Sequence, residues 1–77
     1  MILVDTRGHK CPVPSLRLRR ALKDVGPGVE ATLLTTDPMA RIDIPFLMNE
    51  LAGQVISLSE ADGILTIKVV SGAGQKD

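Results

Sequence analysis

Aromatic residues and cysteines are almost absent from this chain of 77 residues. Phe46 is the one aromatic residue, and neither Trp nor Tyr occurs. Proteins that bind single-stranded nucleic acid usually stack the bases on aromatic side chains, so this class of function has little support here. Cys11 is the one cysteine, so no disulfide can form within the chain. A disulfide-stapled secreted domain is therefore disfavoured.

Long hydrophobic runs are also absent. The first run, Ile2-Leu3-Val4, ends at Asp5 and is too short for a signal peptide or a membrane span. We therefore expect a soluble cytoplasmic protein. The length predicts one domain with a thin core, because a chain of this size buries only about 60% of its unfolded surface. Hydrophobic residues make up 44% of the chain, which indicates that it folds.

The formal net charge is zero, but the charges are unevenly distributed. Residues 1–26 hold six basic and two acidic residues, whereas residues 27–77 hold three basic and seven acidic ones. A basic N-terminal third indicates an acidic partner surface or a nucleic acid. For any single charge, however, a solvated helix face is the simpler explanation.

The hydrophobic pattern predicts four strands, at residues 1–5, 29–35, 55–60 and 64–70, with Asp62-Gly63 as the hairpin turn between the last two. The 3.6-residue periodicity predicts two helices. The first spans about residues 12–25, and its core stripe consists of Pro14, Leu18, Ala21, Leu22 and Val25. The second spans about 44–52, after Asp43 as N-cap, and its core stripe consists of Ile44, Leu47, Met48 and Leu51.

The expected order is therefore β-α-β-α-β-β. Two right-handed β-α-β crossovers place both helices on one face of the sheet. We expect an α/β two-layer sandwich with a four-stranded mixed sheet, whose last strand is antiparallel to its neighbour. Residues 1–71 form the single domain, and residues 72–77 are expected to be a disordered tail.

The motif Cys11-Pro12-Val13-Pro14 is the strongest candidate for chemistry. Cys11 lies at the start of the first predicted helix, where the helix dipole favours an anion, and Arg7 and Lys10 add positive charge. Such settings lower the pKa of a thiol and make the reactive thiolate. Burial as a structural cysteine is the alternative, but a loop of Arg, Gly, His and Lys is a poor core segment.

Other residues near the motif have smaller roles. Pro12 and Pro14 stiffen the turn, and Gly8 is available for a positive φ. His9 could orient the sulfur, although an exposed loop residue is the commoner reading. One Cys and one His do not make a zinc site, and no phosphate-binding glycine motif occurs, so we expect no metal and no cofactor.

A candidate docking surface lies on the first predicted helix, away from its core stripe. The candidate docking residues are Lys10, Val13, Leu16, Arg17 and Arg20. Isolated exposed aliphatic residues are normal, so the apolar members alone do not define a surface. Phe46 falls off the core face of the second helix and is equally well a contact residue or a cover for a neighbouring loop.

These features together resemble the TusA-like, also called SirA-like, sulfur-carrier family, over nearly the whole chain. The marks are Asp5 and Gly8 ahead of Cys11-Pro12-Val13-Pro14, then Gly26-Pro27-Gly28, Asp37-Pro38 and Asp43-Ile44-Pro45. The resemblance implies a βαβαββ fold and a sulfur carrier of the sulfurtransferase type, rather than a stand-alone enzyme. His9 and Phe46 depart from the family's usual residues, which leaves the partners open.

By this resemblance, Cys11 accepts sulfane sulfur as a persulfide from a cysteine desulfurase or a rhodanese-type donor and passes it to an acceptor protein, with Pro12 and Pro14 as structural support. The family's outlets include 2-thiolation of tRNA, molybdenum-cofactor enzymes and sulfur oxidation. Two other functions stay open. A thiol-based redox or regulatory protein would form a sulfenic acid or mixed disulfide at Cys11, and a small RNA-binding module would use the basic first helix.

Overall fold

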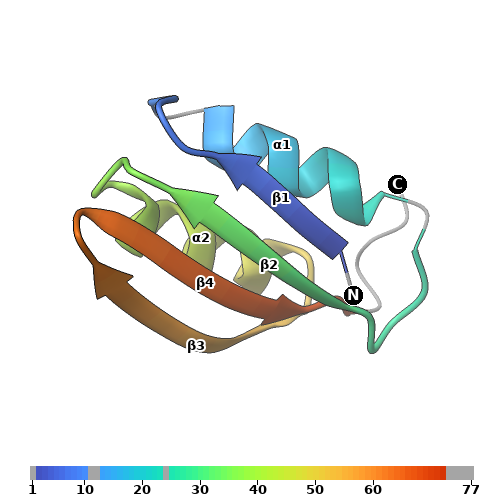
Figure 1. Cartoon of the computed structure of the whole chain (residues 1–77). Helices are drawn as coiled ribbons and strands as arrows, with labels where there is room; N and C mark the ends of the chain where they lie inside the picture. The colour runs from blue at the N-terminus through green and yellow to red at the C-terminus, as the bar shows by residue number, and fades with distance from the viewer. Residues whose placement is uncertain (1, 11–12, 24, 73–77) are drawn as a thin grey trace.

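The computed structural model describes residues 2–10, 13–23 and 25–72 of the chain. A sheet with two helices packed behind it makes up the fold (Figure 1). The elements are β1 (Ile2–Thr6), α1 (Val13–Leu22), β2 (Glu30–Thr35), α2 (Ala40–Glu50), β3 (Gln54–Ala61) and β4 (Ile64–Val70). This is the predicted order, and the strand ends agree with the prediction to within one residue.

The four strands form one mixed sheet in the order β1-β2-β4-β3. β1 and β2 are parallel, and Thr6 is opposite Thr35 at the end of their pairing. β4 lies between β2 and β3 and is antiparallel to both. Both helices lie on the same side of the sheet (Figure 1). The predicted α/β two-layer sandwich is therefore confirmed.

The core lies between the helices and the sheet. Leu18 and Leu22 of α1 are completely buried, and so is Ile44 of α2. They pack in one cluster with inward-facing strand residues, including Leu33 and Ile67. The predicted core stripe of α2 is confirmed, since each of its four residues is buried. Of the stripe predicted for the first helix, Pro14 is buried too, Ala21 is half-buried, and Val25 is half-buried beyond the end of α1.

The start of α2 differs from the prediction. The helix begins at Ala40, and Asp43 lies in its first turn instead of capping it. Asp37 accepts the backbone N–H of Met39 on its carboxylate, at 3.0 Å, and that of Ala40 on its carbonyl oxygen, at 3.1 Å. A tight turn therefore leads into the helix four residues early. Pro45 is tolerated inside α2, on an exposed position.

The two helices also end earlier than predicted. α1 stops at Leu22, where Lys23 and Val25 make i to i+3 hydrogen bonds to Arg20 and Leu22. α2 stops at Glu50, and the next turn is closed by Ala52 at a φ of 60°. The N–H of Gly53 returns to the carbonyl oxygen of Met48, at 2.8 Å. This bond satisfies a carbonyl at the end of the helix.

The hairpin turn between β3 and β4 is confirmed. Asp62 and Gly63 have φ values of 53° and 79°. Two consecutive positive φ values match the right-handed twist of the flanking strands, which explains the Asp-Gly pair. Within residues 2–10, 13–23 and 25–72, no helix has the length and hydropathy that would let it cross a membrane.

The last two described residues are packed against the rest of the fold. Gly72, the first residue of the expected tail, is buried. Ser71 is also buried and holds the start of β2: its side chain accepts the N–H of Val29, at 2.9 Å, and donates to the carbonyl oxygen of Gly26, at 2.6 Å. Residues 73–77 of the expected tail lie outside the described part of the chain.

Candidate functional site

The central residue of the predicted site, Cys11, lies outside the described residues, together with Pro12. Their neighbours are described. Lys10 is exposed, and its carbonyl oxygen accepts the N–H of Val13, the first residue of α1, at 2.9 Å. Cys11 thus precedes the helix by two residues in the sequence. Pro14 of the same motif is described, and it lies against the loop after β2 and the first turns of α2.

The loop after β1 is held by local contacts. Arg7 donates to both carboxylate oxygens of Asp5, at 2.9 Å and 2.7 Å. These hydrogen bonds lower the pKa of Asp5 to about 2. Because the pKa of the folded state is depressed, the contribution of this pair to stability is present at neutral pH. It is lost as the pH falls from 3.8 to about 2.

The pairing of Arg7 changes one sequence-based expectation. We counted Arg7 as a positive charge that favours a thiolate at Cys11. Its guanidinium is instead engaged by Asp5 in an exposed ion pair, so most of its charge is compensated locally. Of the two basic residues, only Lys10 then still supports the expectation that positive charge favours a thiolate at Cys11.

The loops after β1 and β2 are joined to each other. The N–H of Gly8 donates to the hydroxyl oxygen of Thr36, at 2.9 Å, and Gly8 has a φ of 87°. The positive φ predicted for Gly8 is confirmed. Thr6, the last residue of β1, adds a second link: its hydroxyl donates to the carbonyl oxygen of Leu34 in β2, at 2.8 Å. Sequence reasoning did not find Thr36, because the contact joins residues that are 28 positions apart.

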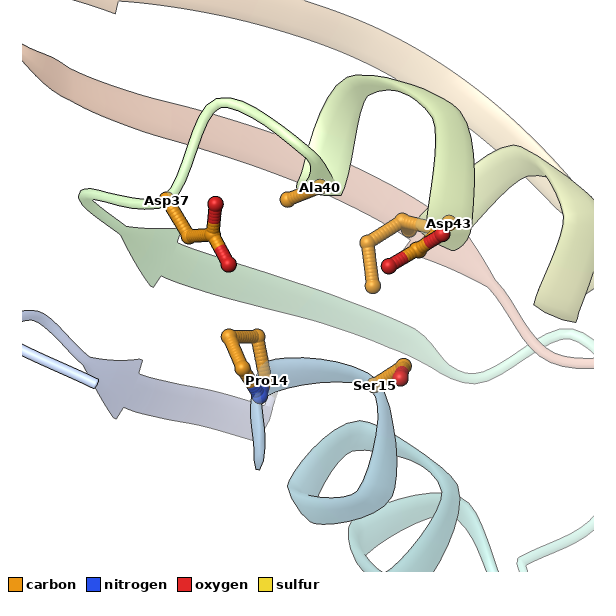
Figure 2. A pocket seen from close by; sticks show the side chains of 6 residues that line it. Pro14, Ser15, Asp37, Ala40 and Asp43 are labelled. Carbon is orange, nitrogen blue, oxygen red and sulfur yellow. The ribbon is translucent and has the colours of Figure 1, made fainter. Parts of the chain in front are cut away.

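The first turns of α1 and α2 meet near the motif (Figure 2). The junction between them is packed and leaves no space for a water molecule. Figure 2 shows the carboxylates of Asp37 and Asp43 directed toward Pro14 and Ser15 of α1. Two acidic side chains therefore approach the first turn of the helix that follows Cys11.

Four of the five candidate docking residues lie on α1, and Lys10 lies in the loop before it. Leu16 is 57% exposed, as its place off the core stripe predicted. Arg17 and Arg20 are exposed as well, whereas Val13 is half-buried and offers less surface than expected. The exposed face of α1 is therefore mainly basic, with Leu16 as its apolar residue.

A groove of about 320 Å³ runs between the two helices. Leu16 and Phe46 lie on opposite walls, and an exposed ion pair between Arg19 and Glu50, at 2.8 Å, joins the helices. Phe46 is 66% exposed, so of our two interpretations the contact residue fits better than the loop cover. The residues that line the groove are Ser15, Leu16, Arg19, Asp43, Phe46, Leu47 and Glu50.

The described residues also bear on metal binding. In the part of the chain that the structure describes, no three His, Cys, Asp or Glu side chains come together as a metal site would require. His9, the residue we considered as a partner for the sulfur, is exposed, and its backbone N–H donates to the carbonyl oxygen of Thr6, at 3.1 Å.

Comparison with known proteins finds one matching family and several similar proteins. The family described as "Sulfurtransferase TusA" matches residues 2–71. The sulfur carrier protein TusA of Pseudomonas aeruginosa is 38% identical over 56 residues, which cover 68% of this chain and 71% of that protein. A relative from Neisseria meningitidis is 35% identical over 66 residues, which cover 86% of this chain and 89% of that protein.

A solved structure gives the same result. The crystal structure of a SirA-like protein from Desulfitobacterium hafniense superposes with a TM-score of 0.83 at 28% identity. The match covers 94% of this chain and 99% of that one. The similarity thus includes both helices and the whole sheet.

Proposed function

We propose that this chain, which belongs to the TusA sulfurtransferase family, is a cytoplasmic sulfur carrier that holds sulfur as a persulfide on Cys11. The observation that carries the proposal is the family match over residues 2–71, within which the chain has a single thiol. The relative from Pseudomonas aeruginosa is itself named a sulfur carrier protein. We carry over Cys11 as the reactive residue, with Gly8, Pro12 and Pro14 as the residues that shape its turn.

The chemistry consists of two thiol exchanges. The Cys11 thiolate attacks the outer sulfur of a donor persulfide, the S–S bond of the donor breaks, and the donor leaves as a thiolate. Cys11 is then the persulfide. A thiolate of the acceptor attacks the outer sulfur in turn, and Cys11 leaves as a thiolate. No oxidant or reductant is consumed, and no general base is needed when the attacking thiols are ionised.

The donor is a cysteine desulfurase or a rhodanese-type protein, and the acceptor is another protein of a sulfur relay. The sulfur is then used in the 2-thiolation of tRNA, by a molybdenum-cofactor enzyme, or in sulfur oxidation. Because a relay protein must meet two partners at one sulfur atom, its reactive residue should lie on a surface that each partner can cover. The exposed loop of residues 7–10 is compatible with that requirement.

The test of the function is direct loading. The protein is incubated with a cysteine desulfurase and cysteine, and its intact mass is measured. We expect a mass increase of one sulfur atom, which a reducing agent removes. Treatment with peroxide distinguishes the redox alternative, because it adds oxygen instead of sulfur. A protein that gains oxygen from peroxide but no sulfur from the desulfurase would exclude the carrier function.

The basic face of α1 should guide the partner. We expect the double variant Arg17→Glu, Arg20→Glu to slow sulfur transfer by roughly tenfold at low salt, because charges outside the contact mainly speed the encounter. The rate of the variant should also depend less on salt. Lys68→Glu, which changes an exposed cation on β4, is the matched control and should transfer at the wild-type rate. Equal rates for the double variant and the wild type at low salt would mean that the face is only solvated.

Leu16 provides a second test of the same surface. Leu16→Ala should weaken binding to the donor without unfolding the domain, since the side chain is 57% exposed. Circular dichroism is the folding control. A loss of helical signal in this variant would contradict the assignment of the helix faces.

The Cys11 thiol is expected to have a pKa below the value of about 8.5 for a free cysteine. The start of α1 and Lys10 favour the thiolate, whereas the carboxylates of Asp37 and Asp43 oppose it. Asp37→Asn should therefore lower the thiol pKa further by tenths of a unit, and Lys10→Ala should raise it. The rate of alkylation by iodoacetamide as a function of pH measures all three values. A wild-type midpoint at or above that of free cysteine would show that the carboxylates dominate.

A further inference from the structure

We propose that Thr36 is a positioning residue for Cys11, because its hydroxyl group fixes the loop that leads to the cysteine. The inference rests on the proposed sulfur-carrier function, which supplies the reason for a fixed loop. A sulfur that passes between proteins has to be presented in a defined direction, since in-line attack on an S–S bond has a strict geometry. Thr36 does not need to touch the sulfur for this role.

The topology brings the two loops together. β1 and β2 are parallel neighbours, and their pairing ends with Thr6 opposite Thr35. The loops that follow, residues 7–10 and 36–39, therefore leave the sheet side by side at the same end (Figure 1). The 2.9 Å hydrogen bond from the Gly8 N–H to the Thr36 hydroxyl oxygen joins them there.

Gly8 explains why such a bond matters. A Cβ at this position would meet no atom within 4 Å, so the glycine is required by its φ of 87° and not by lack of space. Glycine has the largest conformational freedom of all residues. Without a restraint, the chain could turn about Gly8 only three residues before Cys11. The hydrogen bond to Thr36 provides a restraint at the point where the chain is most free.

Thr36 is itself well placed to act as an anchor. On one side, Thr35 is fully buried, and its hydroxyl oxygen accepts the N–H of Asp37, at 3.1 Å. On the other side, the Asp37 carboxylate accepts the N–H of Met39, one residue before α2. The residues on both sides of Thr36 are thus hydrogen-bonded to the end of β2 and to the start of α2, and these bonds hold the segment that restrains Gly8.

The experiment compares Thr36→Val, which removes the hydroxyl at nearly constant shape, with Thr36→Ser, which keeps it. In Thr36→Val, the amide proton of Gly8 should exchange with solvent about fivefold faster, which is the factor that corresponds to one typical net hydrogen bond. NMR measures this exchange. Transfer of sulfur from the donor protein should slow by a similar factor. Thr36→Ser should match the wild type in both measurements.

Two further measurements separate positioning from other effects. Alkylation of Cys11 by iodoacetamide should be unchanged in Thr36→Val, because a small reagent needs no defined orientation, whereas a donor protein does. Thr66→Val is the matched control, because Thr66 is a half-buried threonine in the middle of β4. It should leave Gly8 exchange and sulfur transfer at their wild-type values.

Several outcomes would overturn the proposal. These are unchanged Gly8 exchange in Thr36→Val, identical defects in Thr36→Val and Thr36→Ser, or a transfer defect matched by an equal loss of alkylation. The proposed function fails separately: if the wild-type protein takes up no sulfur, the carrier role is excluded. The Gly8 exchange rates then decide by themselves whether Thr36 restrains the loop.

Discussion

Cys11→Ser protein is expected to gain no sulfur from a cysteine desulfurase. A serine hydroxyl has nearly the shape of the thiol but is not ionised at neutral pH and forms no persulfide. Since the chain has no other cysteine, no second thiol can take over. The expected effect is a complete loss of the adduct in intact-mass measurements, with a circular dichroism spectrum like that of the wild type.

His9→Ala is the matched control for this experiment. The histidine is two residues from the cysteine and exposed, and an ionised thiol needs no base. We therefore expect His9→Ala to load at a rate close to that of the wild type. A sulfur adduct on Cys11→Ser protein would contradict the assignment of the carrier residue, and a complete loss in His9→Ala would show that the thiol depends on a base.

Gly72→Ala is expected to lower the stability of the domain strongly, because it adds a methyl group where there is no space for one. A Cβ at Gly72 would overlap the backbone carbonyl of Ala52 and crowd the nitrogen of Gly53. Backbone atoms cannot move aside as a flexible side chain can. Overpacking of this kind costs about 1–3 kcal/mol, which is a large share of the roughly 4–12 kcal/mol expected for a domain of this length.

Thermal unfolding measures this loss. For a domain of this size, each kcal/mol corresponds to about 4–8 °C in Tm, so a decrease on the order of 10 °C is expected. Gly26→Ala is the matched control, because a Cβ at Gly26 meets no atom within 4 Å and the residue has no positive φ. If both variants melt at the wild-type temperature, the C-terminal residues do not pack against the turn after α2.

The fold could be predicted largely from the sequence because its signals are local. Alternating apolar residues defined the strands, and Asp62-Gly63 specified the hairpin that the structure contains. The start of α2 was missed for an equally local reason. We took Pro45 as evidence against an earlier start, but Asp37 and Pro38 supply an entry turn for a longer helix. Pro45 lies inside this longer helix, on an exposed position.

The surroundings of the candidate site could not be predicted in the same way. The approach of Asp37 to Pro14, and of Thr36 to Gly8, depends on how two crossovers place distant loops at one end of the sheet. No periodicity in the chain encodes these distances. Arg7 shows the opposite case: its partner Asp5 is two residues away, and the pair could have been considered from the sequence.

The strand order has a consequence for how the protein is made. β4, the last strand in the chain, lies between β2 and β3. On the ribosome, β1, β2 and both helices are synthesised before the strand that joins the two halves of the sheet exists. A chain truncated before residue 64 lacks the strand that joins β2 to β3. It should therefore be a substrate for proteases instead of a folded fragment.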